Sequence, residues 1–323
     1  MTLHTLRAAL VAALACALAT PAFGQASYPS QTIRFVIPAG AGGLPDTVAR
    51  ILGKRLQEKV GQNVVVENRA GGNGAVSVGV LMSSPPDGHT FIVQDGSIYA
   101  INPHIYAKMA YNIDDLIPTV MIASAPLFLA AHSKVPVTSM KEFIDYVKTN
   151  PGKLNYGSSG VGSTHHLSME ALKASLGLQL THVPFKGTSE SVPALLGGHV
   201  DIAFSAYPSL SAAIGNKNIT LLATNGAARS AQAPNAPPVA DFIPGYEFAP
   251  KIGIYARAGT PPAMLQKIAA EVAAIVKEPE IIKQFAAAGI EPSGVSLAPY
   301  QAMLKADSER VAKTVKAAGM TPQ

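Results

Sequence analysis

The chain has 323 residues, of which 48% are hydrophobic and 14% charged. This composition excludes an intrinsically disordered chain and indicates two domains or one large α/β domain, at ~100–200 residues per domain. The formal charge of +5 comes from 25 Lys and Arg that are scattered singly, without a basic stripe, so we expect no nucleic-acid partner.

Residues 1–26 have the pattern of a cleavable export signal. Arg7 precedes an apolar run of 12 residues, 8–19, and small residues follow up to Ala26. Twelve apolar residues are too few for a membrane span of ~20. Cys16 in this run offers a conceivable lipid-anchor site, but we expect cleavage after Ala26, or after Gly24. The sequence therefore predicts a protein released into the periplasm.

Removal of this segment leaves 297 residues without cysteine. Loss of Arg7 lowers the basic count from 25 to 24, and against 20 acidic residues the net charge becomes +4. An exported chain without disulfides must derive its stability from burial, as in a large α/β protein.

The remaining chain alternates between strand and helix patterns. The first unit has a strand at 32–37, a Gly-rich turn at 38–45 and a helix at 46–60. Further strands are expected at 64–66, 90–93, 154–156, 181–183 and 201–204, and further helices at 163–176, 189–196, 208–214, 263–277 and 280–288, with a last helix that contains Tyr300 and Val315. This alternation indicates mostly parallel sheets.

Two long extended segments, 120–123 and 251–256, flank a stretch of about one domain's length. We interpret them as hinge strands between two lobes. Lobe 1 would comprise 27–123 and 247–323, and lobe 2 would comprise 124–246. The predicted fold is thus α/β with two lobes, each a mostly parallel sheet flanked by helices.

Enzyme motifs fail when they are compared letter by letter. The glycine runs 40–43 and 160–162 lack the third glycine of the dinucleotide fingerprint, and the run 157–161 is not G-x-S-x-G. His165 and His166 are followed by Glu170 without a second cluster, so we expect no metal site. The pattern predicts neither a cofactor nor an enzyme.

Three Gly/Ser/Thr loops, 38–45, 96–97 and 158–164, each join a strand to a helix. Such loops expose amide donors at a helix N-terminus, which suits a carboxylate. The alternative is that the glycines only form turns and that Ser163 or Thr164 is an N-cap. For Asp46, helix capping and contact with a donor group on a ligand both stay open.

Motifs of one family run in order through the mature chain. They include Tyr28-Pro29, Val36-Ile37-Pro38, Gly61-Gln62-Asn63-Val64, Glu67-Asn68-Arg69, Pro86-Asp87-Gly88, Asn102-Pro103, Asn150-Pro151-Gly152-Lys153, Ser159-Gly160-Val161-Gly162-Ser163, Pro184-Phe185-Lys186-Gly187 and Gly259-Thr260-Pro261. On these motifs the sequence resembles the Bug family, the periplasmic solute-binding receptors of tripartite tricarboxylate transporters.

The resemblance implies a monomeric Venus-flytrap receptor that encloses a small organic acid and delivers it to a membrane permease. Di- and tricarboxylates, aromatic carboxylates and amino acids are all possible ligands. The implied ligand-binding residues are Gly42, Gly43, Leu44 and Asp46 in one lobe and Ser159, Gly162, Ser163 and Thr164 in the other. Ser97, His165 and Ser205 complete the expected set.

Three positions depart from the family's usual residues: Ser205 replaces Asp, Lys251 replaces Trp and Phe185 replaces Tyr. A lost acid and an added base near the hinge would make the cleft less hostile to a second negative charge. This would disfavour an amino-acid ligand, whose ammonium needs an acid.

Two other functions stay open at this point. A receptor of the same fold could signal to a membrane sensor kinase. A periplasmic hydrolase could use Ser163 with His165 or His166, although the sequence shows no ordered triad.

Overall fold

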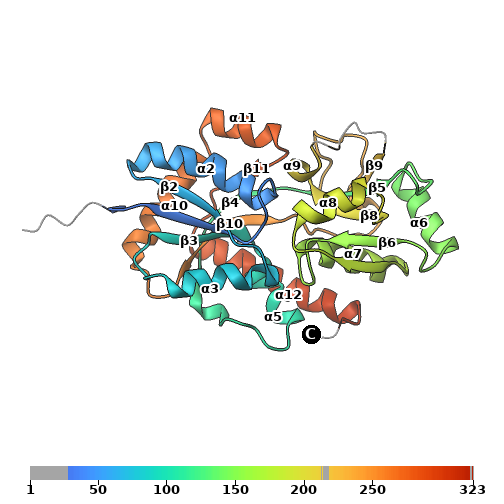
Figure 1. Cartoon of the computed structure of the whole chain (residues 1–323), viewed down its shortest axis with the longest axis horizontal. Helices are drawn as coiled ribbons and strands as arrows, with labels where there is room; N and C mark the ends of the chain where they lie inside the picture. Colours follow the sequence, from blue (N-terminus) through green and yellow to red (C-terminus); the bar gives the residue numbers. More distant parts are fainter. Residues whose placement is uncertain (1–27, 212, 214–217, 321, 323) are drawn as a thin grey trace, which may run out of the picture.

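The computed structural model describes residues 28–211, 213, 218–320 and 322. The predicted export signal, with Cys16, lies outside these residues. The described chain forms two sheets flanked by helices, which lie side by side along the long axis of the molecule (Figure 1). The predicted α/β class with two sheets is therefore confirmed.

The first sheet has six strands in the order β11-β4-β10-β3-β1-β2. Its strands are β1 (Ile33–Ile37), β2 (Val64–Asn68), β3 (Thr90–Asp95), β4 (Leu116–Ser124), β10 (Lys251–Arg257) and β11 (Glu291–Pro292). The helices of this half are α2 (Leu44–Val60), α3 (Ala75–Ser83), α4 (Ser97–Ala100), α5 (Asn102–Ile105), α10 (Pro262–Ile275), α11 (Pro279–Ala287) and α12 (Ala298–Ala317). Short 3₁₀ turns occupy Gly72–Gly74 and Ile113–Asp115.

The second sheet has five strands in the order β7-β6-β8-β5-β9. Its strands are β5 (Leu127–His132), β6 (Asn155–Ser158), β7 (Thr181–Pro184), β8 (Ile202–Ala206) and β9 (Ile219–Thr224). The helices are α6 (Met140–Thr149), α7 (Thr164–Leu176), α8 (Thr188–Leu196) and α9 (Tyr207–Leu210), and a 3₁₀ turn follows at Val239–Asp241. The helix expected at 208–214 begins one residue earlier and ends at Leu210, and positions 212 and 214 of that prediction lie outside the described residues.

Both sheets are mixed, so the expectation of mostly parallel sheets is wrong. β1 pairs in parallel with β2 and β3, and β6 with β7 and β8, as strand-helix-strand units require. β10, however, is antiparallel to β3 and β4, and β5 is antiparallel to β8 and β9. These strands carry the chain between the two sheets, so no crossover helix forces them into parallel pairing.

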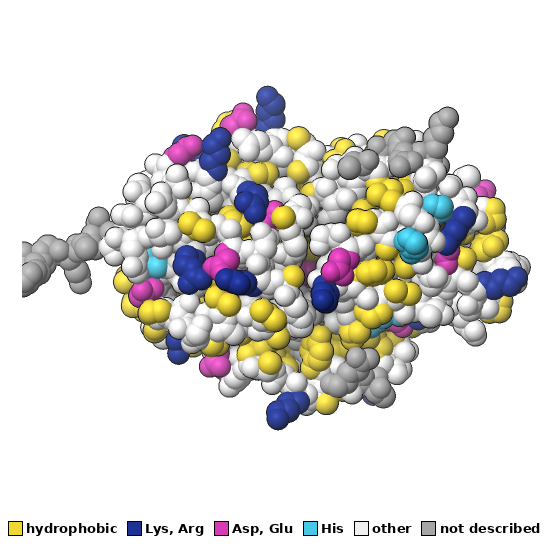
Figure 2. Space-filling model, viewed as in Figure 1, with side chains coloured by type: hydrophobic (Ala, Val, Ile, Leu, Met, Phe, Trp, Pro, Cys, Tyr) yellow, Lys and Arg dark blue, Asp and Glu magenta, His cyan; other side chains and the backbone are white. Residues whose placement is uncertain are grey.

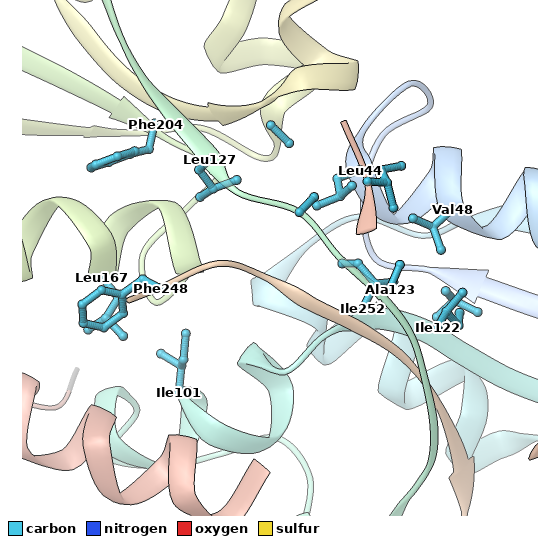
Figure 3. Packing of buried hydrophobic residues seen from close by; sticks show 14 of the residues in the cluster. Leu44, Val48, Ile101, Ile122, Ala123, Leu127, Leu167, Phe204, Phe248 and Ile252 are labelled. Carbon is cyan, nitrogen blue, oxygen red and sulfur yellow. The ribbon is translucent and has the colours of Figure 1, made fainter. Parts of the chain in front are cut away.

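The chain passes between the sheets along two adjacent segments. β4 ends at Ser124, opposite Lys251 at the start of β10, and the Ala125 amide donates to the Pro250 carbonyl at 3.2 Å. The apolar core continues through this crossing. Figure 3 shows Leu127 on the outgoing segment and Phe248 on the returning one, both in the same buried cluster as residues of each half.

The local sequence of helix α2 determines where this helix begins and ends. Pro45 lies in its first turn, where a missing N–H costs nothing. Gly61 ends the helix in the left-handed conformation with φ 69°. Val48 and Leu52 are fully buried against the first sheet. The start of α2 is thereby held at the carboxyl end of β1.

Charged side chains of both signs are distributed over the surface, and many of them form ion pairs. On the face shown in Figure 2, Lys and Arg are interspersed with Asp and Glu over both halves. None of the helices that the structure describes is long and apolar enough to span a membrane.

Replacing Gly253 with Ala should destabilise the fold, because a Cβ there would lie 2.2 Å from the hydroxyl oxygen of buried Tyr300. We expect a loss of about 1–3 kcal/mol in the free energy of unfolding, measured by urea denaturation. Gly79→Ala, at an exposed position of helix α3 with nothing within 4 Å, is the control and should gain about 0.5–1 kcal/mol. Equal stability of the two variants would contradict this packing.

Candidate functional site

A cavity of about 220 Å³ lies between the two sheets. A cavity of this size suits a small ligand. Both halves contribute to its wall. The lining residues are Pro38, Ala39, Leu44, Pro45, Gly71, Gly72, Asn73, Gln94, Asp95, Tyr106, Pro250 and Ile252 from the first half and the hinge, and Ser159, Gly160, Val161, Ser163, His165, Phe185, Lys186, Gly187, Thr188, Ala206 and Ser209 from the second.

The N-termini of three helices line this cavity. Leu44 begins α2, Ser163 caps α7, and Gly187 caps α8, which Thr188 begins. The first amides of a helix lack intrahelical acceptors, and the helix dipole adds a partial positive charge there. The cavity therefore offers backbone donors and positive potential from both halves, which suits an anion.

The loop from 158 to 163 is held by its own hydroxyl groups. The Ser163 hydroxyl donates to the Gly160 carbonyl at 2.7 Å and accepts from the His166 amide at 3.2 Å. The Ser159 hydroxyl is hydrogen-bonded to Nδ1 of His165 at 2.8 Å. Burial lowers the pKa of His165 to about 4, so this ring is neutral at pH 7. Its Nε2 is buried and has no partner among the described residues.

Behind this loop, three rings form a stack. The ring centroids of Tyr156 and His182 are 4.8 Å apart, and those of His182 and His166 are 4.1 Å apart. His182 Nε2 is hydrogen-bonded to the Ser158 hydroxyl at 2.7 Å, and His166 Nδ1 accepts from the Gly162 amide at 3.2 Å. Burial lowers the pKa of both histidines, that of His182 to about 4. The loop is therefore supported by neutral histidines.

The two halves are hydrogen-bonded to each other around the cavity. Asn73 Nδ2 donates to the Gly162 carbonyl at 2.6 Å, and the Tyr106 hydroxyl donates to the Val161 carbonyl at 2.9 Å. Farther from the cavity, Gln232 Nε2 donates to the Ala286 carbonyl at 2.6 Å. The structure is thus in a closed arrangement.

Four of the sequence-predicted residues line the cavity and seven do not. Leu44, Ser159, Ser163 and His165 are in its wall. The others are Gly42, Gly43, Asp46, Ser97, Gly162, Thr164 and Ser205, which lie next to lining residues or behind them.

Asp46 faces its own helix start rather than the cavity. Its carboxylate accepts from the Gly42 amide at 3.0 Å, from Arg50 at 2.9 Å and from Asn68 at 2.9 Å. These hydrogen bonds from Arg50, Gly42 and Asn68 outweigh burial and lower the pKa of Asp46. The Gly43 amide donates to the Gly40 carbonyl. The amide bonded to Asp46 belongs to Gly42, which precedes the N-cap residue Gly43, so Asp46 holds the turn before α2, and it does not line the cavity.

Gly162 and Thr164 contact the opposite half. The Gly162 amide and carbonyl are both bonded, as described above, and the Thr164 hydroxyl donates to Asp95 Oδ2 at 2.7 Å. The Ser97 hydroxyl donates to the other oxygen of Asp95 at 2.6 Å. Ser205 is fully buried opposite Phe128 in the sheet and does not line the cavity, and its hydroxyl oxygen has no hydrogen-bond partner among the described residues.

The charge balance expected near the hinge is wrong. Lys251 does not line the cavity, because its ammonium group is bonded to the Asp307 carboxylate at 2.8 and 3.0 Å. An acid lines the cavity instead: Asp95, at the end of β3. The argument from Ser205 and Lys251 against an amino-acid ligand therefore has no support in the geometry.

Sequence reasoning missed several polar residues of the cavity, namely Asn73, Gln94, Asp95, Tyr106, Lys186, Thr188 and Ser209. Gln94 and Asp95 directly follow the apolar residues of β3, at the same carboxyl edge as the glycine loops. That position was a usable signal. Within the part of the chain that the structure describes, no three His, Cys, Asp or Glu side chains are grouped to hold a metal ion.

The histidine stack predicts a loss of stability in mild acid. A histidine with a lowered folded-state pKa binds its proton in the unfolded chain first, so stability falls as the pH drops from 6.5 toward 4. We expect the melting temperature to fall over this range, and to fall less steeply in His182→Gln. Exposed His199→Gln is the control. The pKa of Glu170 is also lowered, but its effect on stability is lost only as the pH falls below the pKa of an ordinary glutamate, and so below most of this range. A pH-independent melting temperature between 6.5 and 4.5 would contradict this prediction.

Comparison with known proteins places the chain among transport receptors. A family model described as tripartite tricarboxylate transporter family receptor matches residues 48–320. The chain is 37% identical to the Cupriavidus necator UPF0065 protein in the gbd 5' region over 262 residues, which are 81% of this chain and 79% of that protein. It is 29% identical over 269 residues to BugT of Bordetella pertussis, covering 82% of each chain.

Solved structures show the same fold. Rpa4515 of R. palustris, solved with adipate, has a TM-score of 0.88 and 32% identity, covering 92% of this chain and 100% of its own. MatC of Rhodopseudomonas palustris, with bound malate, has a TM-score of 0.81 and 25% identity, covering 89% of this chain and 100% of its own. The periplasmic binding protein BugD has a TM-score of 0.85 and 27% identity, with 92% and 100% covered. The chain therefore belongs to the tripartite tricarboxylate transporter receptor family, and its two-sheet structure is the fold of the family's periplasmic binding proteins.

Proposed function

We propose that the cavity binds a small organic acid by its carboxylate and that the closed protein delivers this solute to the membrane permease of a tripartite tricarboxylate transporter. The convergence of three helix N-termini on one cavity carries the proposal, because the first amides of a helix lack intrahelical acceptors and the helix dipole adds positive potential there. Adipate in Rpa4515 and malate in MatC support a carboxylate as the ligand class.

The proposed moving units are 27–123 with 247–323, and 124–246. The positions at which the chain changes sheets, after Ser124 and before Lys251, support this division. The protein would act as a monomer in the periplasm, after removal of residues 1–26. Ligand binding would favour closure, because the donors come from both units and are complete only when these meet.

We further propose that the protein has no catalytic turnover. The Ser163 hydroxyl donates to the Gly160 carbonyl instead of a histidine. The serine–histidine pair in the cavity is Ser159 with His165, and Nε2 of that ring has no carboxylate partner among the described residues. A triad requires that third group to orient the base.

Carboxylates should stabilise the protein in a thermal-shift panel. At free ligand ~100 times its dissociation constant, binding contributes about 2.7 kcal/mol. For a protein of this size the melting temperature should rise by roughly 4 °C. The panel contains citrate, succinate, aspartate, nicotinate and terephthalate, each beside its amide or ester, because loss of negative charge removes the attraction to the helix N-termini. Ser159→Ala should weaken carboxylate binding, and neither this variant nor the wild type should hydrolyse an ester or an amide.

Two results would overturn this proposal. One is equal stabilisation by the amides, the esters or a neutral sugar. The other is hydrolysis of an ester or amide that Ser159→Ala or Ser163→Ala abolishes.

Closure is tested by Gly162→Val. A Cβ at Gly162 would lie 3.1 Å from Ile105, 3.3 Å from Asn73 and 3.4 Å from Tyr106, all across the interface, at φ +80°. We expect at least about a tenfold loss of affinity by isothermal titration, equivalent to 1.4 kcal/mol. Gly152→Val is the matched control, since Gly152 has φ +72° but nothing within 4 Å. Normal binding by Gly162→Val would show that this contact does not limit closure.

A further inference from the structure

Asp95 brings a negative charge into the cavity wall. It ends β3, and its carboxylate accepts from the Ser97 hydroxyl at 2.6 Å, the Ser97 amide at 3.2 Å, Gln94 Nε2 at 3.4 Å and the Thr164 hydroxyl at 2.7 Å. All of these donors are neutral. They orient the carboxylate but leave its charge uncompensated.

Basic groups near the cavity do not neutralise this charge. Among the ion pairs of the described residues, none includes Asp95. Lys251 is paired with Asp307. His165 is neutral at pH 7, because burial lowers its pKa to about 4. Lys186, which lines the cavity, belongs to the second half beside the start of α8 and is exposed.

A second acceptor lies beside Asp95. Gln94 is 5% exposed and lines the same cavity, and its Oε1 is buried without a hydrogen-bond partner among the described residues. Its amide nitrogen donates to the Ser97 hydroxyl at 2.8 Å, and that hydroxyl donates to Asp95. This chain of donors fixes the orientation of the Gln94 amide. Oε1 is then an acceptor that lacks a donor, which costs free energy until one arrives.

We propose that Asp95 and Gln94 select a ligand that carries a positively charged nitrogen as well as its carboxylate. The helix N-termini attract the carboxylate, whereas Asp95 repels a second anion and attracts an ammonium group. The ligand class is therefore a zwitterionic acid, such as an amino acid, in preference to a dicarboxylate of the same length. This inference rests on the proposed function and narrows its substrate class.

The competing role for Asp95 is closure alone, through the hydrogen bond from Thr164. In that case loss of the bond would weaken the binding of every ligand by the same factor. A selective role changes the ratio of affinities between ligands with and without an ammonium group. The two roles are therefore distinguished by the ratio of the affinities for ligands with and without an ammonium group, and not by the affinity for one ligand.

The experiment measures affinities by isothermal titration for three matched pairs: aspartate and succinate, leucine and 4-methylpentanoate, 5-aminopentanoate and adipate. In each pair the first member carries the ammonium group. In every pair that binds, we expect the wild-type protein to prefer the first member by about tenfold or more, as for a charge-assisted hydrogen bond. Asp95→Asn, which keeps the size of the side chain and removes its charge, should abolish this preference.

Thr164→Val is the control, because it removes the closure bond and leaves the Asp95 charge. It should weaken both members of a pair equally. If Asp95→Asn does not fold, the same affinity ratios are measured for Asp95→Ser, and these are compared with the ratios of the wild-type protein. Equal or tighter binding of succinate, 4-methylpentanoate or adipate to the wild type overturns this inference and leaves the proposed function standing. Binding of no carboxylate at all overturns both.

Discussion

The arrangement of the site depends on how the two crossing segments are joined. Asn225, which is fully buried and directly follows β9, accepts from the Leu127 amide at 2.7 Å through its side-chain oxygen. Its side-chain nitrogen donates to the Phe248 carbonyl at 2.8 Å and to the Ser168 hydroxyl at 3.1 Å. One side chain thus ties the outgoing segment, the returning segment and helix α7 together. Because α7 begins at the cavity, the hinge and the ligand loop share one rigid support.

Much of the polar chemistry near the cavity serves to hold the donors in place. The histidine stack fixes Ser158 and the Gly162 amide, and the Asp46 network fixes the turn before α2. These side chains orient the backbone donors and are not themselves the proposed donors to a ligand. They keep the amides of the helix starts oriented before a ligand arrives, which lowers the entropy cost of binding. A local hydrogen-bond network and a ligand contact use the same residue types, so their sequence signatures are alike.

That similarity explains what the sequence could and could not predict. Spacing and apolar runs located β1, α2, α7 and the two crossing strands, because burial imposes its period on the chain. The glycine loops marked the carboxyl edge of the strands, and Leu44, Ser159, Ser163 and His165 line the cavity there. The direction of each polar side chain depends on partners distant in sequence. Asp46 turns to Arg50 and Asn68, and Asp95 of the first half meets Thr164 of the second. Periodicity carries no information about such pairs.

Few hydrogen bonds described above join the two halves around the cavity, so ligand contacts can contribute a large share of the free energy of closure. A neutral hydrogen bond such as that of Tyr106 or Asn73 contributes only about 1 kcal/mol net, since water replaces it on opening. Reversing a two-state population from 1:99 to 99:1 takes about 5.5 kcal/mol of differential affinity. Hydrogen bonds to a charged group contribute roughly 1.5–3 kcal/mol each, so about two to four between a carboxylate and the helix amides supply this difference. An ammonium group at Asp95 adds one more such bond, at the carboxylate that already receives Thr164 across the interface. Recognition of the ligand and closure around it therefore act through the same atoms.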